Sequence, residues 1–129
     1  MDATLYEHWS DVEGDWWWQY FTPREIACRG TGELLVVPVA LNALMQARSL
    51  LARPMVINSA YRSRLHNIRV GGVPLSPHRI GTAFDISLKG HNRAVVLDCC
   101  KRAGFTGFGF YNSFLHVDLG RTRRWGSWT

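Results

Sequence analysis

Two short segments, separated by about thirty residues, constrain this chain more than any other feature. The first runs from Ser76 to Asp85, and the second is the triplet that begins at His116 and ends at Asp118. Apolar residues flank Asp85 and alternate with His116 and Asp118, which is the period of a β-strand that has one buried face. The pattern therefore predicts two strands that each turn one face to the core and carry acidic and imidazole side chains on the other.

The polar faces of these strands supply a candidate ligand set made of His78, Asp85 and His116. Two imidazoles and one carboxylate hold zinc and leave one coordination position open for water. Gly81 permits a close approach of the backbone between His78 and Asp85, and the small Ala83 leaves room on the same side. The alternative is that the residues are unrelated, because a single histidine on a strand is usually structural and a single aspartate is usually a turn or a cap.

Composition limits the class of protein. A chain of 129 residues that is 47% hydrophobic predicts a single domain over residues 1–129, with a core that needs no disulfides. The three cysteines are odd in number and form no CxxC pair, which indicates folding in a reducing cytoplasm. The formal charge of +5 favours an anionic partner, or serves only solubility.

The sequence shows no targeting or membrane segment. The N-terminus lacks the basic and apolar regions of a signal peptide. No stretch approaches the roughly 20 apolar residues that span a bilayer. We therefore expect synthesis in the cytoplasm without a signal peptide, and no stable insertion into a membrane.

The remaining elements follow from caps and periodicity. Helices are predicted to begin at Thr22-Pro23 and at Pro38, and to cover about 92–103 before Gly104. Residues 60–82 are expected to form a long, structureless and functional loop, and the aromatic, acidic residues 1–21 either pack over the core or form a substrate shelf. Strands are expected at 55–59, 83–88, 108–111 and 114–119, so the fold class is α+β.

Several ordered motifs resemble the M15 family of zinc peptidases, in the branch with a D-Ala-D-Ala carboxypeptidase-like C-terminal domain that phage lysins and bacterial wall enzymes share. The resemblance covers about residues 20–126, around a core at 22–126. It implies a hedgehog/DD-peptidase-like fold, in which a small, mostly antiparallel sheet carries a zinc site and helices pack on it. The motifs are Asn58–Ser63, His66-Asn67, Val70–Gly72, the SxHxxGxAxD motif from Ser76 to Asp85, the HVD motif at His116, the opening at Thr22–Arg29 and the close at Arg123 and Trp125.

Site roles also follow from this resemblance. It assigns the zinc ligands to His78, Asp85 and His116, and substrate anchoring to Arg62, whose guanidinium offers two parallel donors. Arg62 could instead pin the loop, and Ser76 could either bind substrate or cap the loop. Many members carry an acidic general base at the position of Ser113, which cannot serve. Asp118 is then either the general base or the carboxylate that orients His116. A Glu or Asp elsewhere in the chain is the remaining alternative for the base.

The resemblance implies zinc-dependent hydrolysis of a peptide bond in bacterial peptidoglycan, by a D-Ala-D-Ala carboxypeptidase or by an endopeptidase that cuts the cross-link or the stem peptide. We expect Zn²⁺ as the cofactor, peptidoglycan stem peptides as the partner, and a monomer. A phage or prophage endolysin, delivered by a holin or within a virion, would need no signal peptide. One alternative is a catalytically inactive wall-binding module that keeps the fold. The other, a nucleic-acid binder, lacks an ordered docking element, and we expect no nucleic-acid partner.

Overall fold

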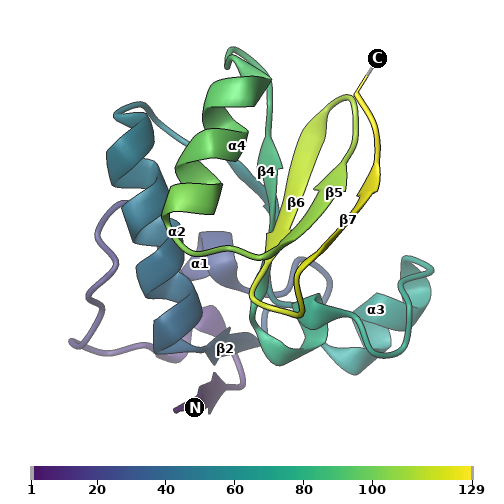
Figure 1. Ribbon diagram of the computed structural model, residues 1–129. Coiled ribbons are helices and arrows are strands. Elements are labelled where there is room, and N and C mark those ends of the chain that lie inside the picture. The colour runs from purple at the N-terminus through teal and green to yellow at the C-terminus, as the bar shows by residue number, and fades with distance from the viewer. Residues whose placement is uncertain (1, 129) are drawn as a thin grey trace.

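The computed structural model describes residues 2–128 and shows an α+β fold (Figure 1). Its elements form two sheets, four α-helices and two short 3₁₀ helices within that range. In chain order they are β1 (Thr4–Tyr6), η1 (Trp9–Asp11), α1 (Pro23–Ile26), β2 (Leu34–Val36), α2 (Pro38–Leu51), β3 (Ile57–Ser59), α3 (Arg64–Arg69), η2 (Pro77–Ile80), β4 (Ala83–Ser87), α4 (Arg93–Arg102), β5 (Gly107–Phe110), β6 (Phe114–Asp118) and β7 (Arg123–Gly126).

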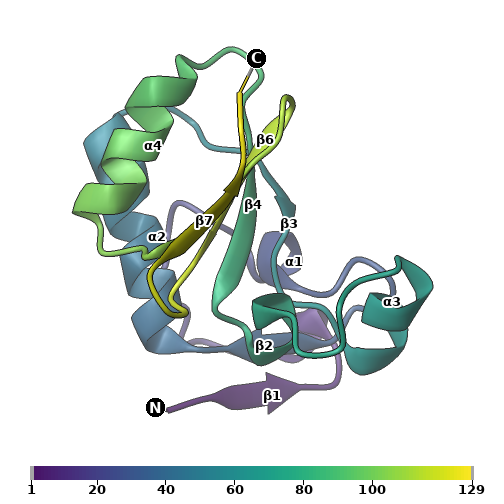
Figure 2. The ribbon, with the colours of Figure 1, turned by 45° about the vertical axis from the view of Figure 1, so that its right-hand side comes forward.

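The main sheet has five strands in the order β3-β4-β6-β5-β7. All neighbours are antiparallel except β5 and β7, which run parallel. Figure 2 shows α2 and α4 side by side against one face of this sheet, while α3 lies on its other side. β1 and β2 form a separate antiparallel pair below. The predicted architecture, a small and mostly antiparallel sheet with helices packed on it, is confirmed.

The helices form where caps and apolar spacing favour them. Thr22 and Glu25 close a reciprocal capping box at α1, and Pro38 occupies the first turn of α2. The apolar stripe of α2 is buried, which confirms a helix that faces the core. α4 ends before Gly104, whose φ of 105° suits glycine. The fully buried side chains of the stripe include Ala40, Leu41, Leu44 and Ala47.

The expectation of a structureless loop over residues 60–82 was wrong. The segment contains α3 and η2, which are capped by the hydroxyls of Ser63 and Ser76. Helices of six and four residues are too short to show an apolar period. β1, β2 and β7 were not predicted for the same reason, because each is only three or four residues long.

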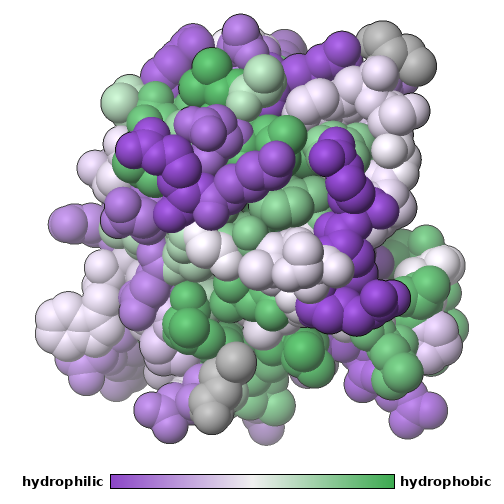
Figure 3. Space-filling model, in the orientation of Figure 1, coloured by the Kyte–Doolittle hydropathy of each residue, from purple (hydrophilic) through white to green (hydrophobic). Residues whose placement is uncertain are grey.

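Charged and apolar side chains are unevenly spread over the surface. Figure 3 shows hydrophilic side chains over α4 and along β7, and hydrophobic ones around the lower part of the same face. Among residues 2–128 no helix is long and apolar enough to cross a membrane.

Candidate metal centre

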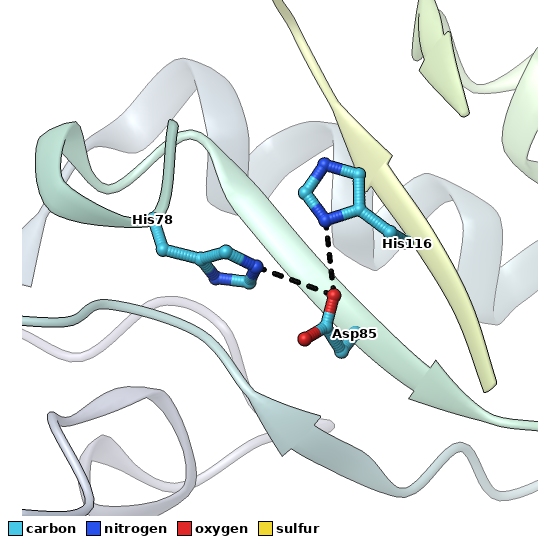
Figure 4. A group of neighbouring side chains, drawn as sticks. All are labelled: His78, Asp85 and His116. Carbon is cyan, nitrogen blue, oxygen red and sulfur yellow. Dashed lines mark hydrogen bonds and ion pairs between the residues drawn. The ribbon is translucent and has the colours of Figure 1, made fainter. Parts of the chain in front are cut away.

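The metal-site candidates meet on the face of the main sheet that α2 and α4 leave uncovered. β4 and β6 pair so that Asp85 lies directly opposite His116, and Ala83 opposite Asp118. His78 reaches the same place from η2 (Figure 4). The sequence thus predicted correctly which side chains share a face, because strand alternation decides it.

The three candidate ligands converge on one carboxylate oxygen. His78 Nε2 lies 3.2 Å from Asp85 Oδ1, and His116 Nδ1 lies 3.0 Å from the same atom. One ligand atom from each residue lies within 4.8 Å of the others. All three side chains are largely buried, so water screens this cluster of polar groups poorly.

A backbone carbonyl fixes the protonation of the His78 ring. Its Nδ1 lies 2.6 Å from the carbonyl oxygen of Ala60, which can only accept a hydrogen bond. Nδ1 must therefore carry the proton, and in the neutral ring Nε2 presents a lone pair. That nitrogen is buried, faces Asp85 and has no hydrogen-bond partner among the described residues.

The Asp118 carboxylate fixes which ring nitrogen of His116 carries the proton. Its Oδ2 lies 2.7 Å from His116 Nε2, and a carboxylate accepts, so Nε2 is the donor. Nδ1 of the neutral ring then turns a lone pair toward Asp85 Oδ1. Two acceptors 3.0 Å apart repel unless a proton or a metal ion lies between them.

The acid–base properties of the cluster reflect this need for positive charge. Burial lowers the pKa of His116, but its hydrogen bonds to Asp118 and Asp85 outweigh burial and raise that pKa. Burial likewise opposes ionisation of Asp85, yet the hydrogen bond from His116 and the nearness of the His78 ring bring its pKa down to about 2. A cation held among the three residues satisfies the same demand, so the donor set fits a divalent metal ion, and the partnerless Nε2 of His78 is the clearest sign of it.

Asp118 lies behind His116 and is fully buried. Its Oδ1 accepts hydrogen bonds from the Gly120 amide and Arg123 Nη1, both at 2.9 Å. Its Oδ2 accepts from His116 and, at 2.7 Å, from Arg123 Nη2. Burial opposes its ionisation, but these bonds hold the pKa of Asp118 well below its usual range. Both oxygens are therefore occupied.

A cleft of about 480 Å³ opens over the three ligands. Its walls combine cationic, aromatic and glycine residues, and among the described lining residues Asp85 is the only carboxylate. A cavity of this size suits a small ligand or a few residues of a polymer. Besides the ligands, the lining comprises Arg62, Gly71, Gly72, Val73, Ser76, Pro77, Tyr111, Phe114, Arg123 and Trp125.

Arg62 lines this cleft and is tied to a ligand through the backbone. Its amide donates to the carbonyl of His78 at 3.0 Å, and its Nη1 donates to Asn67 Oδ1 at 3.1 Å. The buried Nε has no hydrogen-bond partner in the described structure. Burial lowers the pKa of the guanidinium, partly offset by the nearby charge of Asp85.

The other predicted site residues take different places. The buried Ser76 caps η2 by accepting from the His78 amide at 3.2 Å, and it also borders the cleft. Ser113 is exposed in the turn before β6 and is not part of the cleft wall. His66 packs against Gly30 and likewise lies outside the cleft.

Three residues of the site were not predicted as functional. Arg123 forms the ion pair with Asp118, and Trp125 lies against His116 with ring centroids 5.0 Å apart. Trp125 Nε1 donates at 3.0 Å to the hydroxyl of Tyr111, which also borders the cleft. For Arg123 and Trp125, the signal in the sequence was the Gly107-x-Gly109 pattern of β5, whose missing side chains make room for them.

These glycines leave the space that the β7 side chains fill. A Cβ at Gly107 would lie 2.2 Å from Arg123 Nη1, and one at Gly109 would lie 2.5 Å from the ring of Trp125. Any larger residue at either position would displace the Arg123 or Trp125 side chain.

A family model described as Peptidase M15 matches residues 19–118, which include His78, Asp85, His116 and Arg62. A search of curated proteins found no match. The match covers most of the chain and contains all three residues that converge in the metal centre. This chain therefore belongs to the M15 peptidase family.

Proposed function

We propose that this protein hydrolyses a peptide bond in bacterial peptidoglycan with the help of one zinc ion. The observation that carries the proposal is the convergence of two imidazole lone pairs and one carboxylate on a single point in a cleft. Two neutral nitrogens and one anionic oxygen are the ligand set of hydrolytic zinc sites.

Zinc bound there would lower the pKa of a bound water toward about 7 and polarise the scissile carbonyl. The protein's part is to keep His78 and His116 in the tautomers that the metal requires. The Ala60 carbonyl does this for His78, and Asp118 does it for His116. Partners of this kind orient ligands and raise their basicity.

Of the two roles considered for Asp118, we favour the orienting one. A general base must reach the proton it removes, directly or through one water. Asp118 is fully buried behind His116, with both oxygens already bonded. Its low pKa also makes it a weak proton acceptor.

Arg62 would bind the substrate. Its guanidinium borders the cleft and retains donors that no described residue uses. Its planar fork can clamp a carboxylate or a peptide carbonyl and hold the bond over the metal. Ser76 stands at the same wall and can add a hydrogen bond, in addition to its cap.

Peptidoglycan as the substrate is supported by the motif resemblance and by the charge of +5, which suits an anionic wall. Under this proposal the protein acts as a monomeric phage or prophage endolysin that is made in the cytoplasm and reaches the wall through a holin or within a virion.

One observation favours a second candidate, an inactive wall-binding module. Ser113 replaces the usual acidic base, and no described residue of the cleft wall other than Asp85 carries a carboxylate. Such a module would keep the fold and the metal but would not cleave.

The test combines metal analysis with digestion of purified peptidoglycan, for the wild type and for His116→Ala, with the fragments identified by mass spectrometry. We expect about one zinc per chain and release of muropeptides by the wild type only. The fragment masses would name the bond. Zinc without cleavage would establish the binding module, and absence of zinc would overturn the metal site itself.

A further inference from the structure

A second hollow, of about 460 Å³, lies near the N-terminus and shares no lining residue with the metal cleft. β1, the segment at 15–18 and the start of α2 surround it, and Figure 2 places β1 at the lower edge of the molecule. Aromatic and uncharged polar side chains form most of its wall. The lining residues are Thr4, Tyr6, Asp15, Trp16, Trp17, Trp18, Val36, Pro38 and Asn42.

The three consecutive tryptophans of this hollow have different surroundings. Trp18 is buried, and its Nε1 donates to Asn42 Oδ1 at 2.9 Å. Trp16 is half-buried, donates to the Phe21 carbonyl at 2.7 Å and meets Trp18 edge-on. Trp17, in contrast, is 74% exposed. Packing and hydrogen bonding account for two of the rings and leave the exposure of Trp17 without a structural reason.

Polar groups line the same hollow as the exposed ring. The Asn42 side chain uses its oxygen on Trp18, which leaves both hydrogens of the amide nitrogen for a ligand. The exposed Asp15 carboxylate offers acceptors, and the Thr4 hydroxyl can act in either role. A flat apolar face edged by donors and acceptors is complementary to a pyranose ring, which has C–H groups on its faces and hydroxyls at its rim.

Charge narrows the class of ligand. Residues 1–21 contain five acidic residues and neither lysine nor arginine, and no basic residue lines the hollow. Phosphates and nucleic acids are therefore disfavoured. A quaternary ammonium group would require a cage of several aromatic faces, whereas here one exposed ring forms an open shelf.

From these features we infer that the hollow around Trp17 is a binding site for uncharged oligosaccharides of β-1,4-linked N-acetylglucosamine. Chitin consists of this sugar alone, and the glycan strand of peptidoglycan alternates it with N-acetylmuramic acid, whose lactyl group is uncharged while it is amide-linked to the stem peptide. The peptidoglycan assignment rests on the proposed function, but sugar binding itself does not. A site here would hold the glycan strand while the metal cleft works on the attached peptide.

The experiment titrates the metal-free wild-type protein with N,N′,N″,N‴-tetraacetylchitotetraose and with glycan strands stripped of stem peptides, following tryptophan fluorescence and calorimetric heat. We expect saturable binding and a shift of the fluorescence. Trp17→Ala is expected to weaken binding by about tenfold or more. The variant should stay folded, because the ring that it removes is mostly exposed.

A second variant tests the amide. Asn42→Asp keeps an oxygen that can accept from Trp18 but replaces the free N–H donors with a charged carboxylate oxygen, so weaker binding by a variant that stays folded supports the site. Tyr20→Ala is the control, since Tyr20 is an exposed aromatic outside the hollow that stacks under Arg48 and should leave binding unchanged.

The outcomes separate this inference from the proposed function. Sugar binding by a protein that does not cleave peptidoglycan would support the glycan site and refute the peptidase proposal. Binding of chitotetraose but not of stripped strands would assign the site to chitin-like polymers. No binding of either sugar, equal binding by Trp17→Ala, or preference for choline over sugar would overturn the inference.

Discussion

The two faces of β4 and β6 are made from the same ten residues and behave differently. On one face Phe84 and Val117 are cross-strand partners and are buried in the core beneath α2 and α4. On the other face Asp85 and His116 are cross-strand partners and belong to the candidate metal centre. The core face depends on many interchangeable apolar contacts, whereas the metal face depends on a few hydrogen bonds that fix individual atoms. The comparison predicts that damage to the core face is felt as lost stability, and damage to the metal face as lost metal affinity.

Phe84→Ala should give the largest effect on stability. The ring is 1% exposed and meets Phe105 edge-on at 6.1 Å, so its removal leaves a cavity. We expect the free energy of unfolding to fall by about 3–5 kcal/mol, measured by urea denaturation of the metal-free protein. Val56→Ala, at a 60% exposed site beside the sheet, should change it by less than about 0.5 kcal/mol. Similar losses in the two variants would contradict the assignment of Phe84 to the core.

Asp118→Ala should lower both the stability of the fold and the affinity for zinc. It leaves the Arg123 guanidinium without its carboxylate and frees His116 Nε2, so we expect a loss of roughly 3 kcal/mol of stability and of about 10- to 100-fold in zinc affinity. Chemical denaturation and competition with a zinc chelator measure the two effects.

Asp98→Asn is the matched control, because Asp98 forms an exposed ion pair with Arg102. Its loss should change the free energy of unfolding by less than about 0.5 kcal/mol. If Asp118→Ala bound zinc normally but failed to cleave, Asp118 would be the general base instead.

Removal of the metal should affect the wild type alone. Zinc at about a hundred times its Kd would stabilise the folded protein by about 2.7 kcal/mol, so a chelator should lower the Tm of the wild type. His116→Ala and His78→Ala should show no change of Tm with zinc or chelator. If a variant retained the full zinc-dependent shift of Tm, the histidine substituted in it would not be a zinc ligand.

Above about pH 6.5, the pH dependence of stability should reverse on loading with metal. In the metal-free protein the low pKa values of Asp85 and Asp118 stabilise the fold fully above about pH 4, and this contribution is lost as the pH falls through those values. The raised pKa of His116 stabilises below about pH 6.5, a contribution that is lost as the pH rises through the folded value. The contribution of Asp85 is on the order of 2 kcal/mol.

Zinc competes with protons for the same nitrogens, so its stabilising effect should grow as the pH rises above about 6.5. Thermal unfolding with chelator and with excess zinc, from pH 3 to 9, measures both slopes. Parallel curves would show that His116 does not exchange a proton for the metal.

Sequence patterns predicted the core face and the shared face of Asp85 and His116, because alternation along two strands decides both. They could not predict what secures the ligands. The carbonyl of Ala60, which fixes His78, and the guanidinium of Arg123, which holds Asp118, come from segments whose approach depends on the tertiary fold. The choice between two roles for Asp118 remained open in the sequence because our preference for the orienting role rests on its burial, which the sequence does not show. The short elements in residues 60–82 were missed because serine caps and tertiary contacts, rather than an apolar period, stabilise them.

The parallel pairing of β7 with β5 has a consequence for the order of folding. A sheet without β7 would already bring together His78, Asp85 and His116, but it would have neither Arg123 to neutralise Asp118 nor Trp125 to cover His116. Its candidate metal centre would hold a buried, uncompensated carboxylate and an uncovered imidazole. Docking of β7 is therefore the folding step that completes the site.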